Sequence, residues 1–119
     1  MHFAATCGGP LGMENGRILD RQLSASSAWD DNTLRYGSSR ARLRMASWPP
    51  GWNAKKNDPN PWLQIDLGSI KTVTGVATQG YGASQTKEWV KTYSVLTSSD
   101  GKNWETYKVG NKEKVIFTF

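Results

Sequence analysis

Short runs in which apolar and polar residues alternate recur along the chain and predict β-strands. In residues 62–67 (WLQIDL), the side chains of Leu63, Ile65 and Leu67 fall on one side of an extended backbone. Further runs that alternate or are rich in strand-forming residues are 40–45, 72–78, 89–98 and 104–109. Helical periodicity is nearly absent, so the pattern indicates an all-β, antiparallel fold.

One turn between these runs has a strong chemical signature. Residues 98–104 (SSDGKNW) contain the pair Asp100-Gly101 between two predicted strands. An Asp-Gly pair favours the tight turns of β-hairpins, because glycine readily adopts positive φ. The spacing therefore predicts a hairpin between the runs 89–98 and 104–109.

Three long stretches between the predicted strands lack any regular pattern: residues 27–39, 46–61 and 79–87. Loops of this length in a small domain are usually functional or disordered. Disordered linkers are poor in aromatic residues, whereas these loops contain Trp29, Tyr36, Trp48, Trp52 and Tyr81. We therefore expect ordered, functional loops at one end of an antiparallel β-sandwich or barrel.

Composition and charge narrow the function classes only a little. The chain of 119 residues has the length of one domain and a formal net charge of +5. Such a balance favours polyanionic partners, such as anionic lipid, sulfated glycan or nucleic acid, but an ordinary soluble surface can carry the same excess. No run approaches the ~18 apolar residues of a membrane span, so no transmembrane segment is predicted. No secretory signal is visible at the start of the chain.

Enzymatic chemistry finds little support in the residue types. His2 is the only histidine, and Cys7, the only cysteine, has no second histidine to activate it. The chain has no glycine-rich phosphate loop and no Cys/His spacing typical of a metal site. We predict that the protein is not an enzyme and needs no cofactor.

Five segments carry a resemblance to a known family: PLGMENGRILDRQLSASSAW (10–29), RARL (40–43), GWNAKKNDPNPWLQIDLG (51–68), VTGVATQG (73–80) and EWVKTYSVLTSSDGKNWETYK (88–108). In this order and spacing they resemble the discoidin domain, also called the coagulation factor V/VIII type C domain, over nearly the whole chain. The resemblance implies a jelly-roll-like β-sandwich outside the cell. Loops called spikes project from one end of that sandwich and bind lipid, glycan, collagen or a protein receptor.

The resemblance also implies framework roles for several residues. Asp66, a carboxylate between Ile65 and Leu67, is expected to be part of a central strand and to need a charged partner, since burying a lone charge is costly. Arg40 or Arg42 is the expected partner. Trp52 matches a tryptophan common in the family and is expected to be structural.

The C-terminal end departs from the family pattern. Cys7 matches a disulfide cysteine whose partner lies in a further C-terminal segment, and the divergence begins at residues 114–119 (KVIFTF). We therefore expect residues 1–119 to be a single discoidin-like domain that is incomplete at its C-terminal end. Such a molecule is expected to be marginally stable, with a β-prone, aggregation-prone terminus.

The three loops supply the candidate ligand-binding residues. The first offers an aromatic tip with polar neighbours, the second a tryptophan beside two prolines together with basic residues, and the third a tyrosine beside amide donors. The candidates are Trp29, Arg35, Tyr36, Trp48, Asn53, Lys55, Gln79, Tyr81 and Lys87. Alternatives stay open for the first loop: Trp29 can fold back onto the sandwich, and Asp30, Asp31 and Asn32 form either a Ca²⁺ site or a solvated turn.

Three functions follow from these expectations. The first is a non-catalytic module for cell adhesion or surface recognition that grips anionic phospholipid or a cell-surface receptor. The second is a carbohydrate-binding module that targets glycans, and the third is a truncated isoform or fragment without independent function. Nucleic acid is not an expected partner, because no basic cluster exceeds two consecutive residues.

Overall fold

The computed structural model of the chain describes residues 2–5, 9–81, 88–109, 112–113 and 115–117, and the side chains of 9–81 and 88–108. Short strands make up most of the regular secondary structure of these residues, and every strand pairing is antiparallel. The strands are β1 (His2–Ala5), β2 (Gly9–Pro10), β3 (Leu23–Ala25), β4 (Leu63–Ile65), β5 (Gly75–Ala77), β6 (Thr92–Ser94), β7 (Leu96–Thr97), β8 (Glu105–Thr106), β9 (Lys108–Val109), β10 (Lys112–Glu113) and β11 (Val115–Phe117). The all-β prediction is confirmed.

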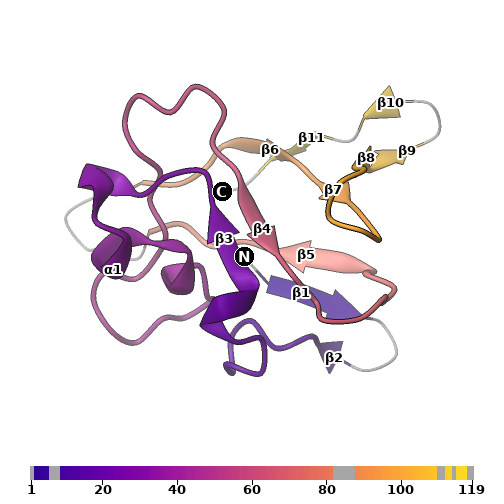
Figure 1. Cartoon of the computed structure of the whole chain (residues 1–119), viewed down its shortest axis with the longest axis horizontal. Coiled ribbons are helices and arrows are strands. Elements are labelled where there is room, and N and C mark those ends of the chain that lie inside the picture. Colours follow the sequence, from indigo (N-terminus) through magenta and orange to yellow (C-terminus); the bar gives the residue numbers. More distant parts are fainter. Residues whose placement is uncertain (1, 6–8, 82–87, 110–111, 114, 118–119) are drawn as a thin grey trace.

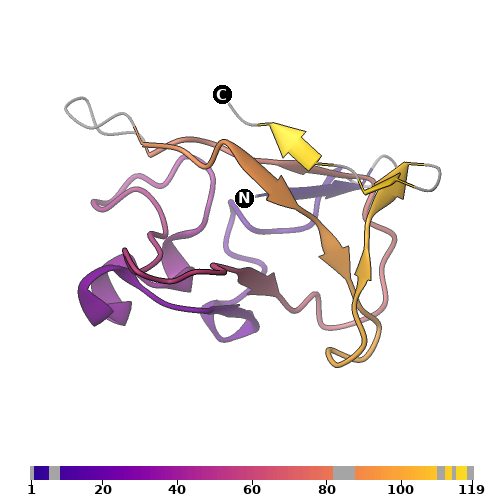
Figure 2. The same cartoon turned by 90° about the horizontal axis from the view of Figure 1, so that it is seen from above.

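Helical structure in the described part of the chain consists of one short α-helix and three 3₁₀ turns. The short helix α1 (Thr33–Tyr36) lies between the 3₁₀ turns η2 (Trp29–Asp31) and η3 (Ser38–Arg40), and η1 (Asp20–Gln22) precedes β3. Figure 1 shows α1 at the left end of the molecule and the strands β7 to β10 at the right end. Figure 2, seen from above, shows the same separation.

The strands form five small sheets, with the orders β2-β1-β5, β3-β4, β11-β6, β7-β8 and β10-β9. The predicted hairpin at Asp100-Gly101 is confirmed, because β7 and β8 pair antiparallel on either side of it. Gly101 has a φ of 74°. The Asp100 carboxylate accepts hydrogen bonds from the backbone N–H groups of Lys102 and Asn103. These bonds hold the pKa of Asp100 below its usual range.

The core lies beneath β3 and β4. Met13, Ile18, Leu23 and Ala41 form one buried cluster, and Leu11, Trp52, Leu63, Ile65 and Leu67 pack against it from positions that are partly exposed. The predicted apolar side of the run 62–67 therefore does face the core. Strand register explains this placement, since β3 pairs Leu23 with Ile65 and Ala25 with Leu63.

The predicted strand over residues 40–45 is wrong. Arg40 ends η3, and Ala41–Met45 form no strand. Arg44 has a φ of 50°, which lies in the left-handed region and cannot continue a β-strand. The segment instead turns so that Ala41 enters the core and the flanking arginines bond backbone carbonyls.

The predicted pairing of Asp66 with Arg40 or Arg42 is also wrong. Asp66 is exposed, and its Oδ1 accepts a hydrogen bond from Gly68 N at 2.8 Å. Arg40 donates to the carbonyls of Ser47 and Pro49, while Arg42 donates to the Met13 carbonyl and to Asp20. Ile65 and Leu67 on either side of it pack on the core, so the Asp66 carboxylate points to the opposite side and remains in solvent, where it shapes a turn and needs no buried cation.

Candidate binding site at the loop end

The described parts of the three predicted loops lie at the α1 end of the molecule (Figure 1). We call residues 27–39 loop 1, residues 46–61 loop 2 and residues 79–87 loop 3, of which the structure describes 79–81. Loop 1 is less irregular than predicted, since it contains η2, α1 and most of η3. Asn32 caps α1, because its Oδ1 accepts a hydrogen bond from Arg35 N at 3.0 Å.

Backbone hydrogen bonds join loops 1 and 2. Trp29 N donates to the carbonyl of Asn53 at 2.8 Å, and Asn53 N donates to the carbonyl of Tyr36 at 3.3 Å. One residue of loop 2 therefore holds both ends of the helical part of loop 1. This arrangement assigns Asn53 a structural role that its place in the sequence did not reveal.

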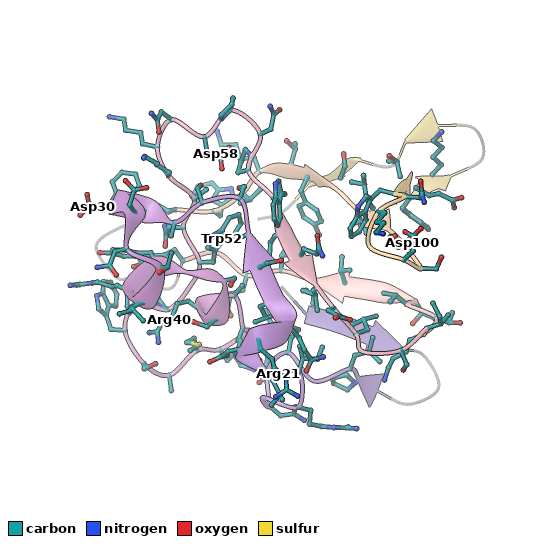
Figure 3. The ribbon with its side chains drawn as sticks, in the orientation of Figure 1. Arg21, Asp30, Arg40, Trp52, Asp58 and Asp100 are labelled. Atoms are coloured by element: carbon teal, nitrogen blue, oxygen red, sulfur yellow. The ribbon has the colours of Figure 1, made fainter. Side chains whose placement is uncertain are left out.

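Trp52 joins the same two loops to the core. Its Nε1 donates to the Ser27 carbonyl at 2.9 Å, and its ring packs against the buried cluster. Figure 3 shows Trp52 in the interior of the loop end, between Arg40 and Asp58. The structure thus places Trp52 where a framework residue belongs.

A carboxylate ties the base of loop 2 to the start of loop 1. Asp58 Oδ2 accepts hydrogen bonds from the hydroxyl groups of Ser26, at 2.6 Å, and Ser27, at 2.7 Å. Asp58 Oδ1 accepts a third from Asn60 N. The serine hydroxyls, followed by the Asn60 N–H, lower the pKa of Asp58, because each bond favours the ionised form.

This network predicts an acid-sensitive contribution to stability. Because the pKa of Asp58 is lower in the folded chain, its ionised form stabilises the fold above about pH 4, the pKa region of an unfolded aspartate, and this contribution is lost as the pH falls through the folded pKa. Asp58→Asn is expected to lower the thermal unfolding midpoint at neutral pH, with a difference from the wild type that shrinks in acid. Differential scanning fluorimetry across pH measures both effects.

Asp30→Asn is the matched control for that experiment. Asp30 is also an aspartate of the loop end, but it is exposed and lies at the outer edge of the molecule (Figure 3). Its φ of 55° suits asparagine as well as aspartate. Equal shifts for the two variants would contradict the role given to Asp58.

Loop 3 meets loop 2 through two aromatic rings. The ring centroids of Trp48 and Tyr81 lie 5.6 Å apart at an interplanar angle of 74°, which is an edge-to-face contact. A Cβ on Gly51 would lie 3.4 Å from the Tyr81 ring, so the backbone of loop 2 passes close to that ring. Burial raises the pKa of the Tyr81 phenol, and the nearby Tyr36 and Glu88 add to the rise. Tyr36 of loop 1 is therefore a neighbour of the same ring.

Large apolar side chains remain exposed on these joined loops. The exposed fractions are 43% for Trp29, 60% for Trp48 and 92% for Leu34. Trp29 therefore does not fold back into the core. Leu34 was absent from the candidate binding residues, although the pair Leu34-Arg35 within a polar loop was a visible signal.

The charged candidates of loops 1 and 2 have partners of their own. Lys55 Nζ forms an ion pair with Asp31 at 2.9 Å, and the Arg35 guanidinium lies 5.5 Å from the centroid of the Tyr36 ring. Of the acidic and amide residues at the start of loop 1, Asn32 caps α1 and Asp31 is paired with Lys55. Among the side chains that the structure describes, no group of three or more His, Cys, Asp or Glu residues could hold a metal ion.

The remaining candidates differ in their surroundings. Asn53 Oδ1 is buried without a hydrogen-bond partner among the described residues. Gln79 Oε1 accepts a hydrogen bond from Arg44 N at 2.8 Å, which places Gln79 beside the 40–45 segment. Cys7 and Lys87 lie outside the described residues. No helix in the described part of the chain is long and apolar enough to cross a membrane.

Comparison with known proteins agrees with this architecture. The model of the F5/8 type C domain family matches residues 22–119. The chain is 39% identical over 117 residues to human EGF-like repeat and discoidin I-like domain-containing protein 3, covering 93% of this chain and 24% of that protein. It is 36% identical over 111 residues to human coagulation factor VIII, covering 93% of this chain and 5% of that protein.

A third relative extends the comparison to another kind of protein. The chain is 39% identical over 112 residues to chicken neuropilin-1, covering 92% of this chain and 12% of that protein. The chain thus spans a quarter or less of the length of each of these relatives. Because the family model covers most of its residues, the chain belongs to the F5/8 type C, or discoidin, domain family.

Proposed function

We propose that this chain is a single, non-catalytic binding domain that acts outside the cell in adhesion or surface recognition. Its ligand is an anionic phospholipid surface, gripped by loops 1 to 3 at the end of a jelly-roll-like β-sandwich. One observation carries the proposal: Trp29, Leu34 and Trp48 stay exposed on loops that are joined to each other. A protein receptor on the cell surface is the competing partner for the same end.

Insertion of the apolar tips would supply most of the binding energy. Fully burying one large apolar side chain contributes about 1.5–3 kcal/mol, which corresponds to about a tenfold to hundredfold change in affinity. The exposed tips lie on loops held by backbone hydrogen bonds, so little conformational entropy is lost on binding.

Basic residues beside the tips would add a weaker electrostatic attraction. Arg35 adjoins Leu34, and Lys55 and Lys56 lie in loop 2. A basic residue near an anionic membrane contributes about 1 kcal/mol, but the ion pair between Lys55 and Asp31 removes part of that gain. Added salt should therefore weaken membrane binding without abolishing it.

Leu34→Ala is expected to lower the affinity for vesicles containing phosphatidylserine by about tenfold. Leu34 is 92% exposed and alanine favours the helical state, so the fold should be unaffected. Co-sedimentation with phosphatidylcholine vesicles, with and without phosphatidylserine, measures the change. Ile70→Ala is the matched control, because Ile70 is 77% exposed in the segment between β4 and β5, at the opposite end from α1 (Figure 1).

The membrane proposal would be contradicted if both variants lost vesicle affinity equally, or if neither substitution changed vesicle affinity. Binding of the wild type to a soluble receptor ectodomain, with no vesicle binding, would instead favour the protein-receptor function. Vesicle binding and receptor binding can both be measured with the same purified chain.

Carbohydrate binding is a second candidate function, and the contact between Trp48 and Tyr81 favours it. An exposed indole held edge-to-face by a second ring is a preformed surface for stacking a sugar ring. A glycan array probed with the wild type and with Trp48→Ala tests this function. Glycan binding that requires Trp48 but not Leu34 would favour it over membrane insertion.

A further inference from the structure

A short loop before η1 joins two core residues and exposes its own tip. Residues 12–18 are closed by a hydrogen bond from Ile18 N to the Gly12 carbonyl at 3.0 Å. Met13 is fully buried near one end of the loop and Ile18 is buried at the other, whereas Asn15, Gly16 and Arg17 at the tip are exposed. The loop lies between β2 and η1, well away from α1 (Figure 1).

The tip holds the only Asn-Gly pair in the chain. In such a pair the backbone nitrogen of glycine can attack the side-chain carbonyl carbon of asparagine, because glycine has no Cβ to obstruct the approach. The other asparagines precede bulkier residues, among them Thr33, Ala54, Asp58, Pro61 and Trp104. Asn15 is therefore distinct from the other asparagines in its chemistry as well as in its position.

The local geometry favours this attack. Arg17 N donates to Asn15 Oδ1 at 3.0 Å, which folds the carboxamide over its own backbone and polarises its carbonyl. Gly16 has a φ of 80°, and a Cβ built on it would meet no atom of other residues within 4 Å apart from its two chain neighbours, so the tip is not crowded by the rest of the molecule.

We propose that Asn15 is a site of spontaneous deamidation, at which this loop converts itself to aspartate and isoaspartate. Gly16 N forms a bond to Asn15 Cγ and loses its proton, the bond from Cγ to Nδ2 breaks, and ammonia leaves. The product is a cyclic imide. Water then opens the ring: cleavage of the bond from Cγ to Gly16 N gives aspartate, and cleavage of the bond from the α-carbonyl carbon to Gly16 N gives isoaspartate.

The two products act differently on the fold. Aspartate keeps an oxygen where Arg17 N needs an acceptor, so the turn can persist. Isoaspartate routes the main chain through the side chain and lengthens it between Met13 and Ile18, which strains the closed loop. Each product adds a negative charge beside Glu14, whose carboxylate is already paired with Arg44 at 2.6 Å.

The test is to age the folded chain at neutral pH and 37 °C and follow the asparagine-containing peptides by mass spectrometry. Deamidation is expected at Asn15 well before Asn32, Asn53 or Asn103, which serve as controls within the same sample. Labelling by an isoaspartyl methyltransferase identifies the isoaspartate fraction. Gly16→Ala should slow the reaction strongly, and its circular dichroism spectrum shows whether the fold is retained.

A second measurement tests the effect of isoaspartate on stability separately from the deamidation reaction. The aged species are resolved by ion-exchange chromatography, and the isoaspartate form is expected to unfold at a lower temperature than both the parent chain and Asn15→Asp. Reaction at Asn15 no faster than at Asn103, or unchanged modification in a folded Gly16→Ala variant, would overturn the proposal. Equal stability of all three species would overturn the strain attributed to isoaspartate.

Discussion

Replacing Met13 by alanine is expected to lower the free energy of unfolding by about 2–5 kcal/mol. Met13 is the one fully buried large side chain among the described residues, and it packs with Ile18, Leu23 and Ala41. Truncation removes apolar contacts and leaves a cavity that the tight loop 12–18 cannot collapse to fill. The total free energy of unfolding of a small domain is about 5–15 kcal/mol. The urea concentration at the unfolding midpoint should therefore fall strongly in this variant.

Met13→Leu is the matched control for the cavity. Leucine conserves most of the volume, and swaps of this kind usually cost less than about 1.5 kcal/mol. Its backbone carbonyl, which accepts a hydrogen bond from Arg42, is present in both variants. A loss in Met13→Leu as large as that in Met13→Ala would show that side-chain volume is not the cause.

Replacing Trp52 by alanine is expected to destabilise the fold by about 3 kcal/mol and to weaken ligand binding together with it. The value lies at the lower end for a tryptophan truncation, because Trp52 is only partly buried. The change removes both ring packing against the core and the hydrogen bond from Nε1 to the Ser27 carbonyl. Because loops 1 and 2 share this link, denaturant unfolding and vesicle binding should both report it.

Two further variants test which part of the Trp52→Ala effect comes from the lost hydrogen bond and whether the effect is specific to the loop end. Trp52→Phe keeps an aromatic ring but loses the N–H donor and part of the indole volume, with an expected cost of about 1–3 kcal/mol for the carbonyl left unpaired in addition to some lost packing. Trp104→Ala truncates a tryptophan near the opposite end of the molecule, 43% exposed, and should cost less and leave binding unchanged. An effect of Trp104→Ala on vesicle binding equal to that of Trp52→Ala would contradict a specific role for the loop end.

Local features of the fold were predictable because they depend on neighbouring residues. Alternation in the run 62–67 determines which side chains share one side of the strand, and these side chains do pack on the core. The Asp100-Gly101 pair predicts its turn because Gly101 readily adopts the positive φ that the turn between β7 and β8 requires. Aromatic residues in the long loops indicated that these loops are ordered, and for loop 2 the contacts of Trp48 and Trp52 agree.

Other features were not predictable, because the alternation of apolar and polar residues does not indicate which distant groups will form hydrogen bonds. The run 40–45 alternates as well as 62–67 does, yet Arg40 and Arg42 bond carbonyls from distant segments and the backbone turns at Arg44. Asp66 was expected to be a buried charge, but it follows the last residue of β4 and stays in solvent. Its neighbours Ile65 and Leu67 take the core side of the run, which leaves the Asp66 carboxylate on the solvent side.

For this protein, the sequence by itself determined the all-β class, the family, the core side of the run 62–67 and the positions of the loops. These depend on periodicity and on residues close together in the chain. Tertiary structure alone decided that Asn53 joins two loops, that Asp58 holds two serines and that Leu34 is left outside. Each of these depends on which distant segments meet and which polar groups then find partners, and that information is absent from local pattern.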